Sequence, residues 1–227
     1  MATEQLSQVD LTINGSIVLD RLLNSNKRGR ILEGGARSTK TWSILQWLFL
    51  YCQDHKGKTI TISRDRLTWL KATILKDFKE ILDQLGWWNP DNFHQSDPLS
   101  YILNGNEISF IGLDEEAKLH GRKQDIFWIN ELIGTSGSAY NPTRDAFDQL
   151  MMRTTEGWFV DYNPKVTEHW IYDIIRQNQD IEFIHSTMLD NPFLPEMVRQ
   201  TIRSYEPTAD NILRGTADRV KWNIYGL

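Results

Sequence analysis

Short apolar runs alternate along the chain with longer segments in which apolar residues recur at helical spacing. Six runs have the length and character of strands, at residues 30–33, 58–64, 107–113, 125–132, 157–163 and 181–188. Helical patterns lie between or after them, at residues 41–54, 66–85, 142–153, 166–178 and 194–206. This alternation predicts an α/β fold with a mostly parallel central sheet and helices on both faces.

Two parts of the chain depart from the alternation. Asn104 and Gly105 separate two apolar stretches, so residues 101–113 are expected to form a β-hairpin. Residues 1–15 open with a polar stretch, and we expect them to form a flexible N-terminal arm. The remaining residues, 16–227, are then expected to form one domain, which suits the length of the chain.

Composition and charge exclude several classes of protein and site. The single cysteine, Cys52, excludes an internal disulfide, and its apolar neighbours predict a core position. A net charge of −5 argues against an autonomous basic DNA-binding module. The five histidines lack metal-ligand spacing, and the nine tryptophans are expected to pack rather than to stack on bases. No signal peptide and no apolar run of ~20 residues is found, so we expect a cytoplasmic protein without a membrane partner.

A phosphate-binding pattern lies where the first predicted strand gives way to a helix. The pattern G-x-x-x-x-G-K-[ST] is matched by Gly34, Gly35, Ala36, Arg37, Ser38, Thr39, Lys40 and Thr41, except at its second glycine. Backbone N–H groups of such a loop and of the following helix bind phosphate. Lys40 is expected to reach the β- and γ-phosphates of ATP, and the Thr41 hydroxyl is expected to bind Mg²⁺. An ordinary glycine turn before a helix is the alternative interpretation.

Thr39 stands where the pattern has its second glycine. A β-branched residue is tolerated at this position when φ is negative and is strained when φ is positive. The effect of this departure therefore depends on a backbone angle that the sequence does not reveal.

The apolar run at residues 125–129 ends in two polar residues, Asn130 and Glu131. In P-loop enzymes a carboxylate at the end of such a strand holds Mg²⁺. Asn130 stands at that position, and its carbonyl is expected to accept a hydrogen bond from a Mg²⁺-bound water. Glu131 is the candidate general base and a candidate metal ligand. The alternative is a structural salt bridge at the end of a strand.

A third strand pattern, at residues 157–163, contains Asp161 and ends at Asn163, before Pro164. In a parallel sheet the carboxyl ends of the strands face one crevice, where ligands bind. Asn163 is the first candidate for sensing the γ-phosphate, and Asp161 is the second. A strand that simply runs into an Asn-Pro turn is the alternative.

In their order along the chain, these segments resemble the large terminase subunit of tailed bacteriophages. The resemblance covers residues 28–227 and includes the stretches 112–121 and 190–195. It implies a P-loop NTPase fold with ATP and Mg²⁺ as cofactors. It also implies ATP hydrolysis that drives double-stranded DNA into a procapsid, in the cytoplasm of an infected bacterium. The implied partners are the portal protein, the small terminase subunit and further copies of this chain in a ring.

The same resemblance assigns roles to individual residues. Arg37 is similar to the catalytic phosphate-loop arginine of the family, shifted by one position, and Asn163 belongs to the motif that couples hydrolysis to movement. An arginine finger from a neighbouring subunit is worth on the order of 10³–10⁵ in rate. The candidates for it are Arg122, Arg144 and Arg153.

The resemblance also sets limits on the expected activity. The family's C-terminal nuclease domain is expected to be absent from this chain, so DNA cleavage is not expected. A helicase-like P-loop ATPase is a less favoured alternative, because it needs a second motor domain. Another alternative is a non-hydrolysing, nucleotide-dependent assembly module that docks on the portal, which Thr39 and Asn130 support.

Overall fold

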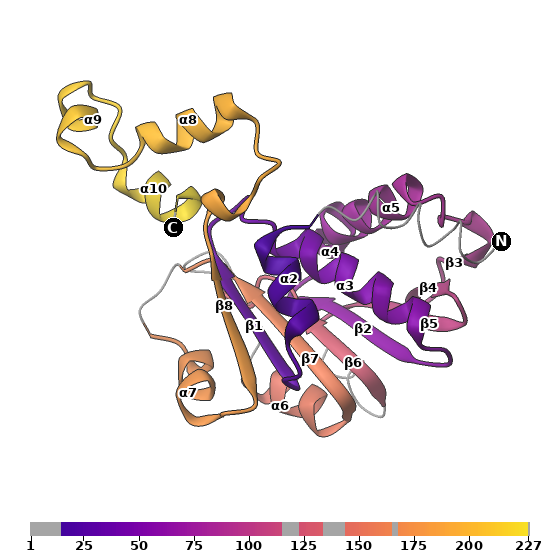
Figure 1. The fold of residues 1–227 in the computed structure, drawn as a ribbon. Helices are drawn as coiled ribbons and strands as arrows, with labels where there is room; N and C mark the ends of the chain where they lie inside the picture. The colour runs from indigo at the N-terminus through magenta and orange to yellow at the C-terminus, as the bar shows by residue number, and fades with distance from the viewer. Residues whose placement is uncertain (1–14, 115–122, 134–143, 165–167, 227) are drawn as a thin grey trace.

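The computed structural model describes residues 15–114, 123–133, 144–164 and 168–226, and an eight-stranded sheet forms its centre (Figure 1). Its strands are β1 (Gly29–Gly34), β2 (Thr59–Arg64), β3 (Phe93–His94), β4 (Leu99–Leu103), β5 (Asn106–Gly112), β6 (Gln124–Ile129), β7 (Thr154–Tyr162) and β8 (Ile181–Ser186). The strand order is β3-β4-β5-β2-β6-β7-β1-β8. The pairs from β5 across to β8 are parallel, whereas β3 and β4 join as antiparallel strands. The predicted mostly parallel sheet is confirmed.

Helices cover both faces of this sheet, as predicted (Figure 1). They are α2 (Ile17–Asn24), α3 (Lys40–Asp54), α4 (Leu67–Ala72), α5 (Ile74–Gln84), α6 (Arg144–Met152), α7 (Trp170–Gln177), α8 (Glu196–Ser204), α9 (Ala209–Leu213) and α10 (Arg219–Tyr225), with short 3₁₀ helices η1 (Pro90–Asn92) and η3 (Met188–Asp190). On β6, Trp128 packs into the cluster under α3 and α5, while Phe127 and Ile129 pack under α6 and α7. The central strands carry apolar residues on both faces because both faces are buried.

The predicted hairpin is present, and its turn has the expected chemistry. Strands β4 and β5 pair antiparallel around Asn104 and Gly105, whose φ angles are 50° and 80°. Asparagine and glycine are the residues that adopt such angles most easily. The predicted strand at residues 125–132 is wrong at its carboxyl end, because β6 stops at Ile129 and the chain turns through Glu131 at φ 49°.

The single helix predicted at residues 66–85 is wrong in one respect, since Thr73 divides it into α4 and α5. Thr73 has φ −119° and ψ −85°, outside the helical region. Its hydroxyl donates to the carbonyl of Trp69 and accepts a hydrogen bond from Arg64, at 2.9 Å each. A tertiary hydrogen bond thus accompanies a break that the apolar periodicity does not reveal.

Several elements were not predicted from the sequence, namely α2, β3, α9 and α10. Helix α2 begins at its N-cap Ser16, whose hydroxyl accepts from the backbone N–H of Leu19 at 3.1 Å. The predicted arm at residues 1–15 lies almost wholly outside the described residues. Helix α7 starts at Trp170 rather than at residue 166, with His169 as its N-cap.

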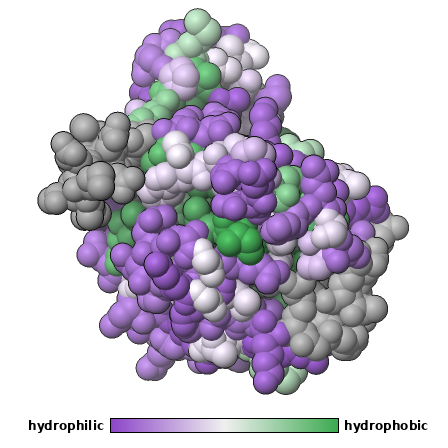
Figure 2. Space-filling model, turned by 90° about the vertical axis from the view of Figure 1, so that its right-hand side faces the viewer, coloured by the Kyte–Doolittle hydropathy of each residue, from purple (hydrophilic) through white to green (hydrophobic). Residues whose placement is uncertain are grey.

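The helices α8, α9 and α10 form a lobe beyond the carboxyl end of β8 (Figure 1). A small apolar cluster of its own holds this lobe together, with Met188, Leu194 and Ile202 at its centre. The space-filling view in Figure 2 shows mostly hydrophilic residues on the coloured part of one face. Within the described ranges, no helix has the length and apolar character required to cross a membrane.

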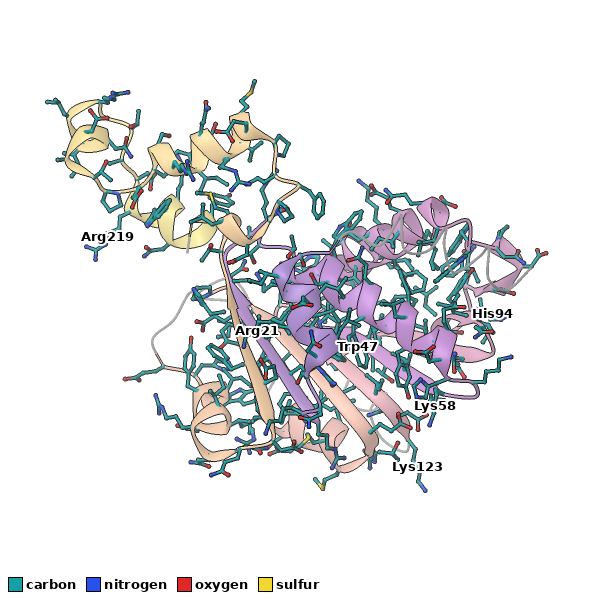
Figure 3. All side chains as sticks on the ribbon, in the orientation of Figure 1. Arg21, Trp47, Lys58, His94, Lys123 and Arg219 are labelled. Atoms are coloured by element: carbon teal, nitrogen blue, oxygen red, sulfur yellow. The ribbon has the colours of Figure 1, made fainter. Side chains whose placement is uncertain are left out.

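The aromatic residues serve packing, as expected. Trp47 of α3 packs against Phe159 on β7, with the ring centroids 4.9 Å apart (Figure 3). The guanidinium carbon of Arg30 lies 4.8 Å from the centroid of the Trp47 ring. All tryptophans except Trp69 belong to the three apolar clusters or pack against them. Cys52 is buried in the cluster under α3, and burial raises the pKa of its thiol to about 12.

Candidate functional site

A cavity of about 870 Å³ opens at the carboxyl ends of β1, β6 and β7. Its floor is the loop at residues 36–41, and Glu131, Asp161 and Asn163 line it from the two neighbouring strands. The three strand ends that the sequence predicted to share one crevice therefore do so. This volume lies within the range of roughly 300–1,000 Å³ that is typical of small-molecule sites.

The loop begins at Gly34, where no side chain fits. A Cβ atom there would lie 1.9 Å from the backbone oxygen of Ser186 on β8. The Ser186 hydroxyl also donates to the Ser38 hydroxyl at 3.0 Å, which ties the loop to β8. Two residues within the loop, Arg37 and Thr39, have positive φ angles of 71° and 70°.

Thr39 is therefore in the left-handed region, which is unfavourable for a β-branched residue. Its hydroxyl makes no capping hydrogen bond to α3 and has one long contact with Ser43, at 3.5 Å. Of the two cases that the sequence left open for Thr39, the strained one at positive φ is the case found. Glycine suits this position because it has no Cβ to crowd the backbone.

Replacing Thr39 with glycine is expected to stabilise the protein by about 1 kcal/mol, the lower end of the cost of such strain. For a chain of this size that corresponds to a rise in Tm of roughly 2–4 °C, measurable by thermal unfolding. Thr39→Ala keeps the Cβ and is expected to recover less of this stability. A Tm that falls in Thr39→Gly would contradict the assignment of strain.

Lys40 is the central cation of the site and is only 6% exposed. Its ammonium lies 2.7 and 2.9 Å from the carbonyls of Gly34 and Gly35, and 3.2 Å from the amide oxygen of Asn163. Burial lowers the pKa of Lys40 to about 8, opposed by the nearby carboxylates of Asp161, Glu131 and Glu33. The side chain therefore remains protonated at neutral pH and links the loop to the end of β7.

Thr41 follows in the first turn of α3 and lines the same cavity. No side chain caps the amino terminus of this helix. Its first N–H groups lack helical partners, and such groups favour an anion. The loop and the start of α3 together provide the features of a phosphate site that the pattern predicted.

Glu131 lies directly after β6 and is held by Arg64, which stands at the end of β2. The guanidinium Nη2 of Arg64 contacts the carboxylate Oε2 of Glu131, and this carboxylate side chain is 39% exposed. Arg64 also donates to the Thr73 hydroxyl at the break between α4 and α5. Glu131 therefore combines the two interpretations made from the sequence, because it is ion-paired and also lines the cavity.

Asn130, directly after β6, lies beside Asp161 of the adjacent β7, and each is 2% exposed. The amide nitrogen of Asn130 donates to both carboxylate oxygens of Asp161, at 3.0 and 3.1 Å. The indole nitrogen of Trp128 donates to the same carboxylate at 2.7 Å. Burial raises the pKa of Asp161 to about 6, opposed by the charge of Lys40 and by these hydrogen bonds. The side-chain amide oxygen of Asn130 is buried and has no hydrogen-bond partner among the described residues.

The remaining predicted residues differ in their relation to the cavity. Arg37 lines it, and its backbone oxygen accepts a hydrogen bond from Asn191 at 2.8 Å. Arg144 opens α6, where it pairs with Asp148 at 2.9 Å, and neither Arg144 nor Arg153 lines the cavity. Arg122 lies outside the described residues.

Two walls of the cavity were not predicted from the sequence. Residues 193–195, between η3 and α8, form one of them, and Asp77, Glu80 and Gln84 of α5 form the other. The only signal for the first wall was the stretch 190–195 in the family resemblance, and the second had none. Among the described residues, no group of three or more His, Cys, Asp or Glu side chains converges as a metal cluster.

Comparison with known proteins gives consistent similarities. A sequence family described as phage terminase large subunit matches residues 26–218. The large terminase of a thermophilic bacteriophage aligns with a TM-score of 0.65 and 17% identity, over 91% of this chain and 50% of that one. The ATPase domain of the Thermus phage P74-26 large terminase aligns with a TM-score of 0.58 and 13% identity, over 90% of this chain and 94% of that one.

A third similar structure is the HK97 bacteriophage large terminase, with a TM-score of 0.57 and 14% identity, over 91% of this chain and 48% of that one. The chain thus spans about half the length of the first and third of these proteins. No curated protein matches the sequence. At these identities the structural likeness establishes the fold, a P-loop NTPase-like α/β domain, whereas the family match covers most of the chain.

Proposed function

Because this chain belongs to the phage terminase large subunit family, we propose that it is the ATP-hydrolysing motor domain of a DNA-packaging terminase. The observation that carries the proposal is one cavity that brings together a phosphate loop, the buried ammonium of Lys40 and the carboxylate of Glu131. The chain spans only half of the large terminase of the thermophilic bacteriophage, so DNA packaging and its partners are part of the proposal.

ATP is the proposed ligand of the cavity. The large terminase of the thermophilic bacteriophage, which has the same fold, was solved with ATP-gamma-S and with ADP. In this chain, the loop and the uncapped start of α3 suit the phosphates. On binding, Lys40 exchanges the carbonyls of Gly34 and Gly35 for the β- and γ-phosphate oxygens.

The residues present also fit Mg²⁺, which binds through oxygen atoms, retained waters and substrate phosphates. Thr41 and Glu131 line the cavity, and the buried amide oxygen of Asn130 has no hydrogen-bond partner within the described part of the chain. These are the protein groups that would hold the ion, directly or through water. When bound, Mg²⁺ would neutralise charge that develops on the phosphates.

Glu131 is the proposed general base, which accepts the proton of the attacking water. Its carboxylate is paired with Arg64 through one oxygen, Oε2, and the residue lines the cavity. Asn163 is the proposed sensor of the γ-phosphate, because it lines the cavity and accepts a hydrogen bond from Lys40, the proposed phosphate ligand. Arg37 is proposed to stabilise the transferred phosphoryl group from within the loop.

The proposed partners follow from family membership alone. They are double-stranded DNA, the portal protein, the small terminase subunit and further copies of the chain in a ring, in the cytoplasm of an infected bacterium. A ring would allow a neighbouring chain to supply an arginine finger, for which Arg122, Arg144 and Arg153 remain candidates.

A non-hydrolysing assembly module is the second candidate function. The strained Thr39 and the pairing of Glu131 with Arg64 favour it, because both weaken the case for an efficient hydrolytic site. In this alternative the nucleotide controls docking on the portal and is not consumed.

Hydrolysis of Mg-ATP measured against protein concentration separates these functions. We expect phosphate release, with a rate per chain that increases with concentration if a neighbouring chain completes the site. Nucleotide binding without turnover at any concentration would favour the assembly module. Absence of both binding and turnover would contradict the two proposals.

A further inference from the structure

The end of β6 has an amide where a P-loop enzyme usually has its Mg²⁺-linked carboxylate. Asn130 occupies this position, and an amide contributes no negative charge. Its nitrogen is turned toward Asp161, so the side chain is already engaged within the protein. A buried carboxylate that lines the same cavity, that of Asp161, lies next to this amide.

The strand order brings Asp161 between the two halves of the site. Strand β7 lies between β6 and β1, and Asp161 is the register partner of Leu32, two residues before Gly34. On its other side, β7 pairs Val160 with Ile129, the last residue of β6. Asp161 thus lies between Asn130, which follows β6, and β1, which leads into the phosphate loop.

Two side chains orient the carboxylate of Asp161, one on β6 and one directly after it. Asn130 donates to both of its oxygens, and the Trp128 indole donates to one of them. Asp161 is 2% exposed and lines the cavity together with Lys40 and Thr41. Among the described residues, no cationic side chain lies within 4.0 Å of it as a salt bridge.

A buried carboxylate without a bound cation is costly for the fold. Its partners here are two neutral hydrogen-bond donors, and the nearest strong positive influence is the charge of Lys40. A cation bound with the nucleotide would compensate this charge.

We propose that Asp161 supplies the carboxylate charge for the Mg²⁺ that accompanies the nucleotide, and that Asn130 is a positioning residue that orients it. This inference rests on the proposed function, since it requires a nucleotide with Mg²⁺ in the cavity. It assigns to Asp161 of β7 the charge that the amide of Asn130 cannot contribute. Sensing of the γ-phosphate is then left to Asn163, which contacts Lys40 directly.

The test compares the affinity for ADP with Mg²⁺ and with EDTA, by titration calorimetry, in wild type and Asp161→Asn. We expect Mg²⁺ to strengthen ADP binding to the wild type. Asp161→Asn is expected to reduce that strengthening by roughly 10- to 100-fold, the usual effect of disturbing a supporting metal contact. Its affinity for ADP in EDTA should not fall, because the lost group is an anion.

The double variant Asn130→Asp/Asp161→Asn exchanges the carboxylate and the amide between the two strands. It retains a carboxylate–amide hydrogen bond, so it guards against a loss caused by misfolding. We expect it to recover most of the Mg²⁺ effect. Electron paramagnetic resonance of Mn²⁺ with ADP provides a direct readout of the ion, and Asp125→Asn, at the other end of β6, is the control for altered stability.

Loss of the Mg²⁺ effect and of bound Mn²⁺ in the single variant, with recovery in the exchange, supports the inference. Retention of both in Asp161→Asn would overturn it while leaving the proposed function intact. A lack of recovery in an exchange variant that still binds ADP in EDTA would also overturn it. If the wild type bound no nucleotide at all, the proposed function would fail together with the inference.

Discussion

Replacing Glu131 with glutamine is expected to lower ATP turnover by roughly 10²- to 10⁴-fold, the usual contribution of a general base. Glutamine has nearly the same shape and still accepts a hydrogen bond from Arg64, so the cavity should keep its form. It cannot accept the proton of the attacking water. Nucleotide affinity is therefore expected to remain within a few fold of wild type, and single-turnover hydrolysis beside equilibrium binding measures both quantities.

Glu182→Gln provides a matched control for this change. Glu182 of β8 forms an ion pair with Arg21 of α2, which Figure 3 labels, at 2.6 Å. This variant therefore also removes a carboxylate from an arginine pair. Its turnover should match the wild type, because Glu182 does not line the cavity. Turnover that persists in Glu131→Gln would remove Glu131 from the mechanism.

Replacing Lys40 with alanine is expected to weaken nucleotide binding strongly. Loss of one partner from a buried charge pair costs about 2–5 kcal/mol, which corresponds to a roughly 30-fold to several-thousand-fold weaker affinity. Lys40 is 6% exposed and lies against the loop carbonyls, and among the described residues no other lysine lines the cavity. Titration with ADP or with a fluorescent analogue measures the loss.

Lys123→Ala is the control that removes the same charge elsewhere. Lys123 precedes β6 and lies with Lys58 at the end of the sheet away from the lobe that carries Arg219 (Figure 3). Its removal is expected to leave nucleotide affinity unchanged. An equal loss of nucleotide affinity in the two variants would indicate a general effect of net charge. Undiminished binding in Lys40→Ala would show that Lys40 does not bind the nucleotide.

Several features of the site were predictable because they depend on neighbouring residues in the chain. The loop pattern, with its glycines, Lys40 and Thr41, lies between a strand pattern and a helical pattern. Neighbouring residues were therefore sufficient to predict the loop. The carboxyl ends of parallel strands lie on one edge, and this rule placed Glu131 and Asn163 at the same crevice from the sequence alone.

Other features depend on contacts between segments that are distant in the chain. The division of residues 66–85 at Thr73 involves the guanidinium of Arg64, which no periodicity within the helix reveals. The wall at residues 193–195 reaches the loop through Asn191 and the Arg37 carbonyl, 154 residues apart in sequence.

The sequence by itself determined the α/β class, the loop and the two polar strand ends, because apolar periodicity and turn chemistry act over a few residues. Only the tertiary structure decided that Thr39 has a positive φ, because that angle belongs to the path of the whole loop, which also contacts β8 through Ser38. It alone decided that Asp161 lies beside Asn130. Strand order follows from how whole layers pack, and the insertion of β7 between β6 and β1 joined a carboxylate and an amide that the chain separates.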